Sequence, residues 1–385
     1  MTLILTQCAA CAVTLQHPAK QCSRCKTRYC GAACQKKHWE EGHDQLCRRI
    51  KKGGGAEQFH ADKKCTAAVA VAVEACAEDT KGQTCYICTQ ALHWKTKEGL
   101  VRMCACRGTA GFAHVSCLAE QAKILIAEAE ENNLDEKVKT KRWERWDMCG
   151  LCEQNHHSVV RCALGWACWK AYVGQTEGHW TRRSAMTTLA NGLHDVGKHD
   201  ERLRIHEAEL AYEQRTGVPE NDVLTTLGNI AGCYTALGRH KESLALGRKV
   251  YDRKCALSHA FPHAFRPESI FITAFGLANQ MCGLGLFDEC KEFAQKRIPE
   301  AERALGPEHG LTLCLRSSHA AALLNSSDAT LDDMRLAVKM MEDVAQTMRR
   351  VLGKSNPRTL ESEQMLANAR MKLAAEEART GLAAL

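Results

Sequence analysis

The chain has 385 residues, long enough for two or three domains, and it carries a formal net charge of +7 at pH 7. No apolar run comes near the roughly 18 residues that cross a bilayer, and the first residues lack the charged segment of a secretory signal. The sequence therefore excludes a membrane-spanning protein and favours a protein of the cytoplasm or the nucleus.

Cysteine is concentrated in the first half of the chain, where eighteen of the 23 cysteines precede residue 169. Many are separated by only one to three residues, a spacing that favours metal ligands over disulfides and fits a reducing compartment. Sixteen Cys and His residues form two series of four pairs, which we call the first and second ladders, each with seven Cys and one His. Since four ligands hold one zinc ion, we expect four zinc ions per chain, two in each ladder.

Zinc also changes the charge of the chain, because a metal-bound cysteine is a thiolate. Fourteen thiolates and four divalent ions together subtract six charges, which leaves a net charge of about +1. The apparent basicity therefore gives little support to nucleic acid as a partner, and we expect proteins and short peptides instead.

The first ladder lies within the first predicted module, residues 1–52. Its candidate ligands are Cys8, Cys11, Cys22, Cys25, Cys30, Cys34, His43 and Cys47. A Cys-x2-Cys pair supplies two sulfurs from one tight turn, and the x3 spacing of the last two pairs predicts two ligands on one face of a helix.

With Tyr29, Gln35 and Trp39 at their places between the pairs, this segment resembles a MYND zinc finger. The resemblance implies interleaved sites, one from Cys8, Cys11, Cys30 and Cys34 and the other from Cys22, Cys25, His43 and Cys47. It also implies that the finger binds short proline-containing peptides. The alternative is that zinc only folds a module too small to have a sufficient core of its own.

Residues 53–80 are predicted to be a linker. Gly53, Gly54 and Gly55 predict a flexible break, and an Ala- and Val-rich segment over 61–79 predicts a short helix. On that helix we expect Cys65 and Cys76 to be small apolar residues rather than ligands.

The second ladder lies in the second predicted module, residues 81–155. Its candidate ligands are Cys85, Cys88, Cys104, Cys106, His114, Cys117, Cys149 and Cys152. The string CACRGTAGFAHVSCL, residues 104–118, resembles the centre of a RING-CH finger, the C4HC3 variant of the RING. The resemblance implies a cross-brace, with Cys85, Cys88, His114 and Cys117 on one ion and Cys104, Cys106, Cys149 and Cys152 on the other.

A RING finger holds a ubiquitin-charged conjugating enzyme in a reactive conformation and has no nucleophile of its own. The resemblance therefore implies no catalytic side chain, and it marks Ile87 as the docking contact for the conjugating enzyme. The alternative for Ile87 is a small core residue. A gap of 31 residues before Cys149, expected to be helical, and Glu153 at a position where many active RING fingers are basic leave ligase activity open.

Residues 156–180 form a predicted connector. Cys162 and Cys168 match no common metal-ligand spacing, and with Trp166 and Trp169 they are expected to pack between domains rather than to bind a further metal ion.

Residues 181–385 are predicted to be helical repeats. The segment that begins at Leu189 recurs at Ile230, 41 residues later, and a second landmark in residues 304–313 recurs 47 residues later. Gly197, Gly238 and Gly285 mark the expected turns between paired helices. The pattern resembles tetratricopeptide repeats of the kinesin-light-chain type, which implies four units, a terminal helix near 359–380 and a protein-binding surface. The alternative is a spacer.

Together these segments predict a mainly α fold, in which two small binuclear cross-brace zinc modules precede a TPR-like α-solenoid. They suggest a RING-type ubiquitin ligase that recruits substrates through its MYND and TPR modules, with a ubiquitin-conjugating enzyme as a partner. The alternative is a non-catalytic zinc-finger adaptor, scaffold or transcriptional regulator. A methyltransferase is excluded because no such catalytic domain is recognisable.

Overall fold

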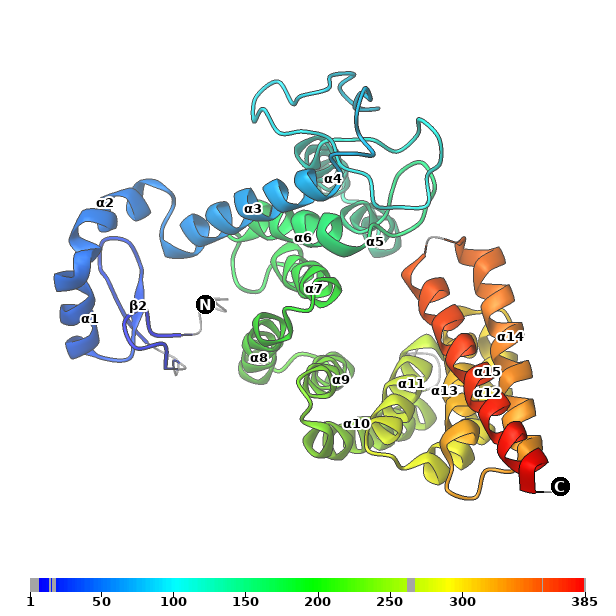
Figure 1. Cartoon of the computed structure of the whole chain (residues 1–385). Coiled ribbons are helices and arrows are strands. Elements are labelled where there is room, and N and C mark those ends of the chain that lie inside the picture. Colours follow the sequence, from blue (N-terminus) through cyan, green and yellow to red (C-terminus); the bar gives the residue numbers. More distant parts are fainter. Residues whose placement is uncertain (1–6, 14, 16–18, 262–266, 355, 384–385) are drawn as a thin grey trace. The chain divides into compact units, whose positions relative to one another are not determined.

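The computed structural model describes residues 7–13, 15, 19–261, 267–354 and 356–383. The chain divides into two compact units, Met1–Arg215 and Thr216–Leu385, and each is built mostly from helices (Figure 1). No helix among the described residues is both long and apolar enough to cross a membrane. The predicted mainly α fold is confirmed.

The first unit begins with a small finger built on a two-stranded sheet. Strands β1 (Lys20–Gln21) and β2 (Arg28–Tyr29) pair antiparallel. They are followed by α1 (Ala32–His38), a π-helical turn (Trp39–His43) and α2 (Asp44–Lys52). Gly42 has φ +112° inside that turn, a conformation that glycine adopts without strain, and it lets the helix change direction just before His43.

The three glycines expected to form a flexible break lead instead directly into a long helix, α3 (Ala56–Ala75). The Ala56 N–H donates to the Cys25 carbonyl (2.9 Å), and Phe59 packs against the core of the finger. Cys65 in the middle of α3 and Cys76 at its C-terminal end pack into the core of the first unit, where both are buried as small apolar residues. The linker is therefore a structured connection.

The 31-residue gap of the second ladder is helical, as predicted, but it holds two α-helices rather than one. These are α4 (Val115–Glu131) and α5 (Glu136–Trp143), followed by a 3-10 turn at Glu144–Trp146. Asn133 has φ +48° between them, and the Asp135 carboxylate accepts from the Val138 N–H (2.9 Å) to start α5.

The core of the first unit is centred on α6 (Ser158–Tyr172), which packs with α3, α4 and α7 (Trp180–Asp195). Helix α8 (His199–Thr216) follows α7. Trp166 and Trp169 are almost completely buried on α6, and so are Cys162 and Cys168, which confirms that they pack, although they do so inside the first unit rather than between domains. The sequence places the repeats from residue 181, whereas the structure groups α7 and α8 with the fingers in the first unit.

Two tryptophan hydrogen bonds attach the second ladder region to α7. The Trp143 indole donates to Thr188 Oγ1 (3.2 Å), and the Trp180 indole donates to a Glu130 carboxylate oxygen (3.0 Å). Trp146 is fully buried in the common core. The second finger is therefore part of one packed body with α6 and α7.

The backbones of α6 and α7 approach closely because each helix has a glycine at their contact. A Cβ on Gly192 would lie 2.8 Å from both the Arg161 carbonyl oxygen and Cys162 Cα. We expect Gly192→Ala to lower the free energy of unfolding of the first unit by about 1–3 kcal/mol, the usual cost of overpacking. Chemical denaturation followed by tryptophan fluorescence measures the unfolding of this unit, because all seven tryptophans precede residue 181 and so lie in it.

The matched control is Gly174→Ala, because a Cβ there meets no atom within 4 Å and the residue is exposed. It should leave the unfolding midpoint nearly unchanged. Equal effects of the two substitutions would contradict the close helix contact.

The second unit is a succession of helical hairpins. Its helices are α9 (Glu220–Ala236), α10 (His240–Ala260), α11 (Pro267–Gly283), α12 (Phe287–Leu305), α13 (Gly310–Asn325), α14 (Leu331–Leu352) and α15 (Pro357–Ala383). Gly238 and Gly285 occupy turns with positive φ, where the sequence predicts them. Ala231 and Ala278 are buried inside their helices and allow close packing. The repeated hairpins confirm an α-solenoid with a terminal helix near the predicted place.

Candidate metal centres

The structure gathers the sixteen ladder residues into four groups, and within each group the ligand atoms all lie within 4.8 Å of one another. The groups are Cys8, Cys11, Cys30 and Cys34; Cys22, Cys25, His43 and Cys47; Cys85, Cys88, His114 and Cys117; and Cys104, Cys106, Cys149 and Cys152. We number these groups one to four. They are the four sets that the two family resemblances imply, interleaved within each finger.

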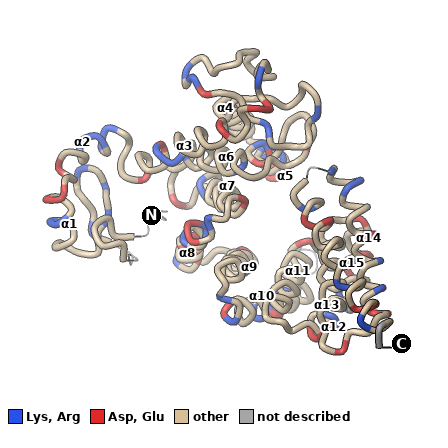
Figure 2. Tube along the Cα trace, in the orientation of Figure 1, with Lys and Arg blue, Asp and Glu red and all other residues tan. Residues whose placement is uncertain are grey.

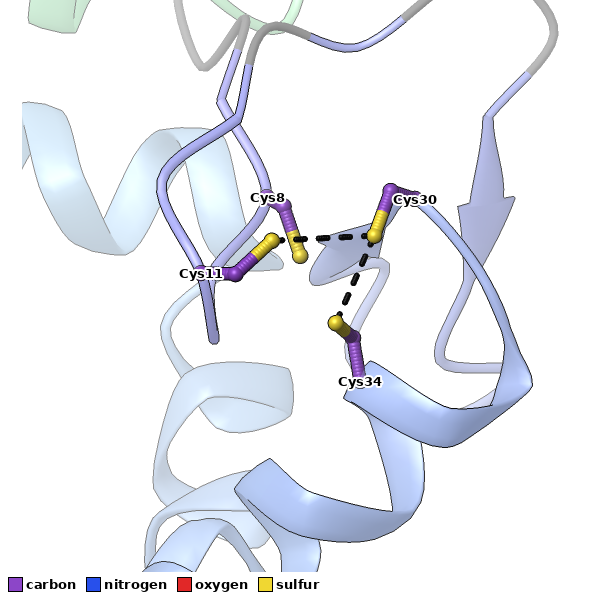
Figure 3. Close-up of side chains that lie close together, drawn as sticks. All are labelled: Cys8, Cys11, Cys30 and Cys34. Atoms are coloured by element: carbon purple, nitrogen blue, oxygen red, sulfur yellow. Dashed lines mark hydrogen bonds between the residues drawn. The ribbon is translucent and has the colours of Figure 1, made fainter.

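Group one brings a tight turn near the N-terminus against the start of α1 (Figure 3). The Cys11 and Cys30 sulfurs are 3.7 Å apart, and those of Cys30 and Cys34 are 3.4 Å apart. Zinc–sulfur bonds of about 2.3 Å at a tetrahedral centre place two sulfurs about 3.8 Å apart, so the geometry suits zinc. Cys30 lies before α1 begins at Ala32, with Gly31 between them in extended backbone, so the predicted sharing of one helix face is wrong for this pair.

Group two is completely buried, whereas Cys11 and Cys30 of group one are exposed. The Cys22 and Cys47 sulfurs are 3.7 Å apart, and His43 Nε2 lies 3.3 Å from the Cys25 sulfur. Burial shields this group from water and competing ligands. The two sites of the first finger are therefore unequal in their exposure to chelators.

His38 has a supporting role that the sequence does not reveal. Its ring stacks on His43 at a centroid distance of 4.8 Å. Its Nδ1 is 3.0 Å from the hydroxyl of the buried Tyr29. Contacts of this kind orient a metal-binding imidazole without touching the metal.

Groups three and four form the second finger. His114 Nδ1 lies 3.4 Å from the Cys88 sulfur and 3.6 Å from the Cys117 sulfur, while its Nε2 is 3.3 Å from the Ala91 carbonyl oxygen. A hydrogen bond to that carbonyl fixes the imidazole tautomer and leaves Nδ1 free for the metal. In group four, the Cys106 and Cys149 sulfurs are 3.7 Å apart.

The Cys-x2-Cys turns share a backbone conformation that their residue types do not predict. The residue after the second cysteine has positive φ in all four, namely Ala12, Lys26, Thr89 and Glu153. Its N–H donates to the carbonyl of the first cysteine, which closes the turn and aims both sulfurs at one point. Because no glycine occupies these positions, the sequence carries no local signal for them.

A fifth turn of this kind contains no cysteine, because His93 and Thr96 occupy the two cysteine positions. The Lys97 N–H donates to the His93 carbonyl (2.9 Å), and Lys97 has φ +60°. In place of a metal ion, a hydrogen bond of 2.8 Å joins His93 Nδ1 to Thr96 Oγ1. The turn leaves the Trp94 side chain 68% exposed on the second finger.

Arg102 and Gly111 shape the segment between groups three and four. The Arg102 guanidinium lies over the Phe112 ring at 4.0 Å and forms a bidentate ion pair with Asp79. Phe112 is buried. A Cβ on Gly111 would lie 2.6 Å from Cys106 Cβ and 2.8 Å from its sulfur, so only glycine fits beside this ligand.

The electrostatics of the clusters favour a cation. The Cys104 thiol donates a hydrogen bond that lowers the pKa of Cys149 to about 4, and the same bond raises the pKa of Cys104 far above its ordinary value. Burial raises the pKa of Cys106 to about 12. Such a group cannot become fully ionised alone, so its four thiolates need a divalent ion, and zinc suits an all-cysteine set.

Ile87 lies half-buried in the turn of group three and packs against the core of the first unit. Apolar side chains in the loops of the second finger are more exposed than Ile87, among them Leu92, Trp94 and Leu151. Basic and acidic residues are interspersed along both units (Figure 2), which fits protein partners better than a nucleic-acid backbone.

Comparison with protein families agrees with the two ladders. Residues 8–47 match the MYND finger, and residues 85–133 match the RING-variant domain. The second match ends before Cys149 and Cys152, which the structure places in group four.

No curated protein sequence matches the chain. Similar solved structures include two crystal structures of a putative kinesin light chain from Podosopora anserina with nearly identical TPR-like repeats, one of them of a substituted form. They are 16% and 17% identical in sequence, both with a TM-score of 0.37, and each match covers 62% of this chain and 97% of the other.

Proposed function

We propose that the protein is a zinc-dependent RING-type ubiquitin ligase that uses its MYND finger and its helical repeats to bind substrates. The observation that carries the proposal is the second finger, a complete cross-brace in which eight donor atoms form two sets of four. The finger contributes no nucleophile. It accelerates transfer by holding a ubiquitin-charged conjugating enzyme in a reactive orientation.

Rigid attachment of the finger supports this role. The Trp143 and Trp180 hydrogen bonds join α5 and α4 of the second ladder to α7, and Trp146 is buried in the common core. A conjugating enzyme docked on the finger would therefore be held in a fixed relation to α6 and α7. Ile87 is the proposed docking contact, with Trp94 as an exposed aromatic side chain on the same finger.

The first finger offers a surface for the short proline-containing peptides that MYND fingers bind. Trp39 is 40% exposed beside the ring of His43, and Leu46 is 43% exposed on α2. An exposed indole is a suitable face for a proline ring, since it supplies a large apolar contact at little entropic cost.

The second candidate is a non-catalytic adaptor in which both fingers serve only as binding surfaces. Two observations favour it: Ile87 packs partly into the core, and Glu153 is exposed where active RING fingers often carry a basic side chain.

An assay with purified activating enzyme, a panel of conjugating enzymes and ubiquitin separates the two candidates. We expect ubiquitin chains from the wild type, no activity from Cys104→Ala, and at least a tenfold loss from Ile87→Ala, the size of a strong interface contact. The matched control is Ile124→Ala, an exposed position on α4 that should retain full activity.

Zinc content must be measured for each variant, so that loss of docking is distinguished from loss of the fold. A wild type that is fully loaded with zinc but inactive with every conjugating enzyme would establish the adaptor instead.

A further inference from the structure

Cys282 and Cys290 face each other across the turn between α11 and α12, with their sulfurs 3.3 Å apart. Cys282 lies in the last turn of α11 and Cys290 in the first turn of α12. The Leu286 N–H donates to the Met281 carbonyl (3.0 Å), which closes the intervening turn. Among the described residues, neither cysteine belongs to a group of three or more metal-binding side chains. The pair is therefore a dithiol separate from the zinc groups.

The two thiols differ in a way that suits oxidation. Cys290 is completely buried, and its sulfur lies 3.5 Å from the Ala278 carbonyl oxygen and 3.9 Å from the Ser318 carbonyl oxygen. Cys282 is partly exposed next to the exposed Gly283. The pKa of Cys282 is lowered because Cys290 donates a hydrogen bond to its sulfur, whereas the pKa of Cys290 is raised. Cys282 is thus the accessible nucleophile and Cys290 the protected thiol.

We propose that Cys282 and Cys290 form a modification site that hydroperoxides convert reversibly to a disulfide. The Cys282 thiolate attacks one oxygen of the peroxide, the O–O bond breaks, and the products are a sulfenic acid on Cys282 and, after protonation, water or an alcohol. The Cys290 sulfur then attacks the Cys282 sulfur, an S–S bond forms, and the sulfenic oxygen leaves as a second water. Two thiols are oxidised by two electrons and one peroxide is reduced.

The packing permits this reaction with a small movement. The sulfurs must approach from 3.3 Å to about 2.05 Å, the length of a disulfide. The residues between them form a short turn, so the disulfide would covalently close the end of the α11–α12 hairpin. Oxidation would remove the Cys290 S–H and move its sulfur relative to the Ala278 and Ser318 carbonyl oxygens, which links oxidation to the packing of α13.

Peptide mapping of the intact, zinc-loaded protein tests the proposal. After exposure to hydrogen peroxide, the protein is denatured, alkylated without reduction and digested with trypsin. Cys282 and Cys290 fall in one tryptic peptide, residues 255–291, together with Cys255 as an internal reference. We expect this peptide to lose two hydrogen atoms in mass and to be alkylated only on Cys255, and dithiothreitol should restore both thiols.

Variants assign the order of the two steps. Cys290→Ala should stop at a sulfenic acid on Cys282 that dimedone traps, and Cys282→Ser should leave Cys290 reduced. In the unoxidised protein, Cys282 should react with iodoacetamide at least about tenfold faster than Cys255, whose pKa burial raises. Full alkylation of Cys282 and Cys290 at peroxide concentrations that already oxidise the zinc groups would overturn the proposal, as would a disulfide to Cys255.

Discussion

Removing zinc from the intact protein is expected to unfold the two ladder regions while α9–α15 stay folded. A structural zinc site contributes about 10–16 kcal/mol of binding free energy, far more than the small core of a finger can replace. The first finger has only a few buried side chains around Tyr29, and four of them are themselves cysteines of groups one and two. The second unit holds none of the four groups, so it has no such dependence on zinc.

Hydrogen exchange after addition of a zinc chelator measures this effect. The amides of Lys26 and Thr89, which donate to the first cysteine of their turns, should lose their protection. Group one, with Cys11 and Cys30 exposed, should release its ion before the buried group two. Amides within α13 and α14 are the internal control. Unchanged protection in the fingers, or equal loss in both units, would contradict a structural role for zinc.

The substitution Gly111→Ala is expected to release one zinc ion from the second finger. The added Cβ would lie 2.6 Å from Cys106 Cβ and 2.8 Å from its sulfur, so Cys106 must move out of group four. A group with three of its four ligands in place holds zinc far more weakly. We expect the variant to bind three ions per chain and to lose activity in the ubiquitin assay.

Gly108→Ala is the matched control for this experiment. Gly108 also has positive φ (+60° against +86° for Gly111), so both variants carry a similar backbone strain of about 1–2 kcal/mol. A Cβ on Gly108 meets no atom within 4 Å. The control should therefore keep four ions, and a loss of zinc from both variants would show that strain, rather than contact with Cys106, controls the site.

The ligands of the metal groups could be predicted because their residue types and short spacings are visible in the sequence. Cys-x2-Cys pairs fix two sulfurs on one turn whatever surrounds them. The way in which the pairs interleave does not follow from spacing, and the family resemblances supplied it. Group four shows this most clearly, since Cys149 reaches Cys106 across a sequence separation of 43 residues.

Features that depend on tertiary packing could not be predicted. The positive φ of Lys97 accompanies a hydrogen bond between His93 and Thr96, and no sequence motif predicts that bond. The stacking of His38 on His43 depends on the wide helical turn around Gly42. The sequence predicts a short helix over 61–79 after a flexible break, whereas α3 begins directly after the glycines at Ala56, because contacts with the finger and with α6 stabilise it.

The zinc content of the purified protein tests the central claim most directly. Elemental analysis of the chain, set against its concentration from amino-acid analysis, should give four zinc ions per chain, one for each group. A value near two would contradict this account, because it would mean that one of the two ladders does not bind zinc.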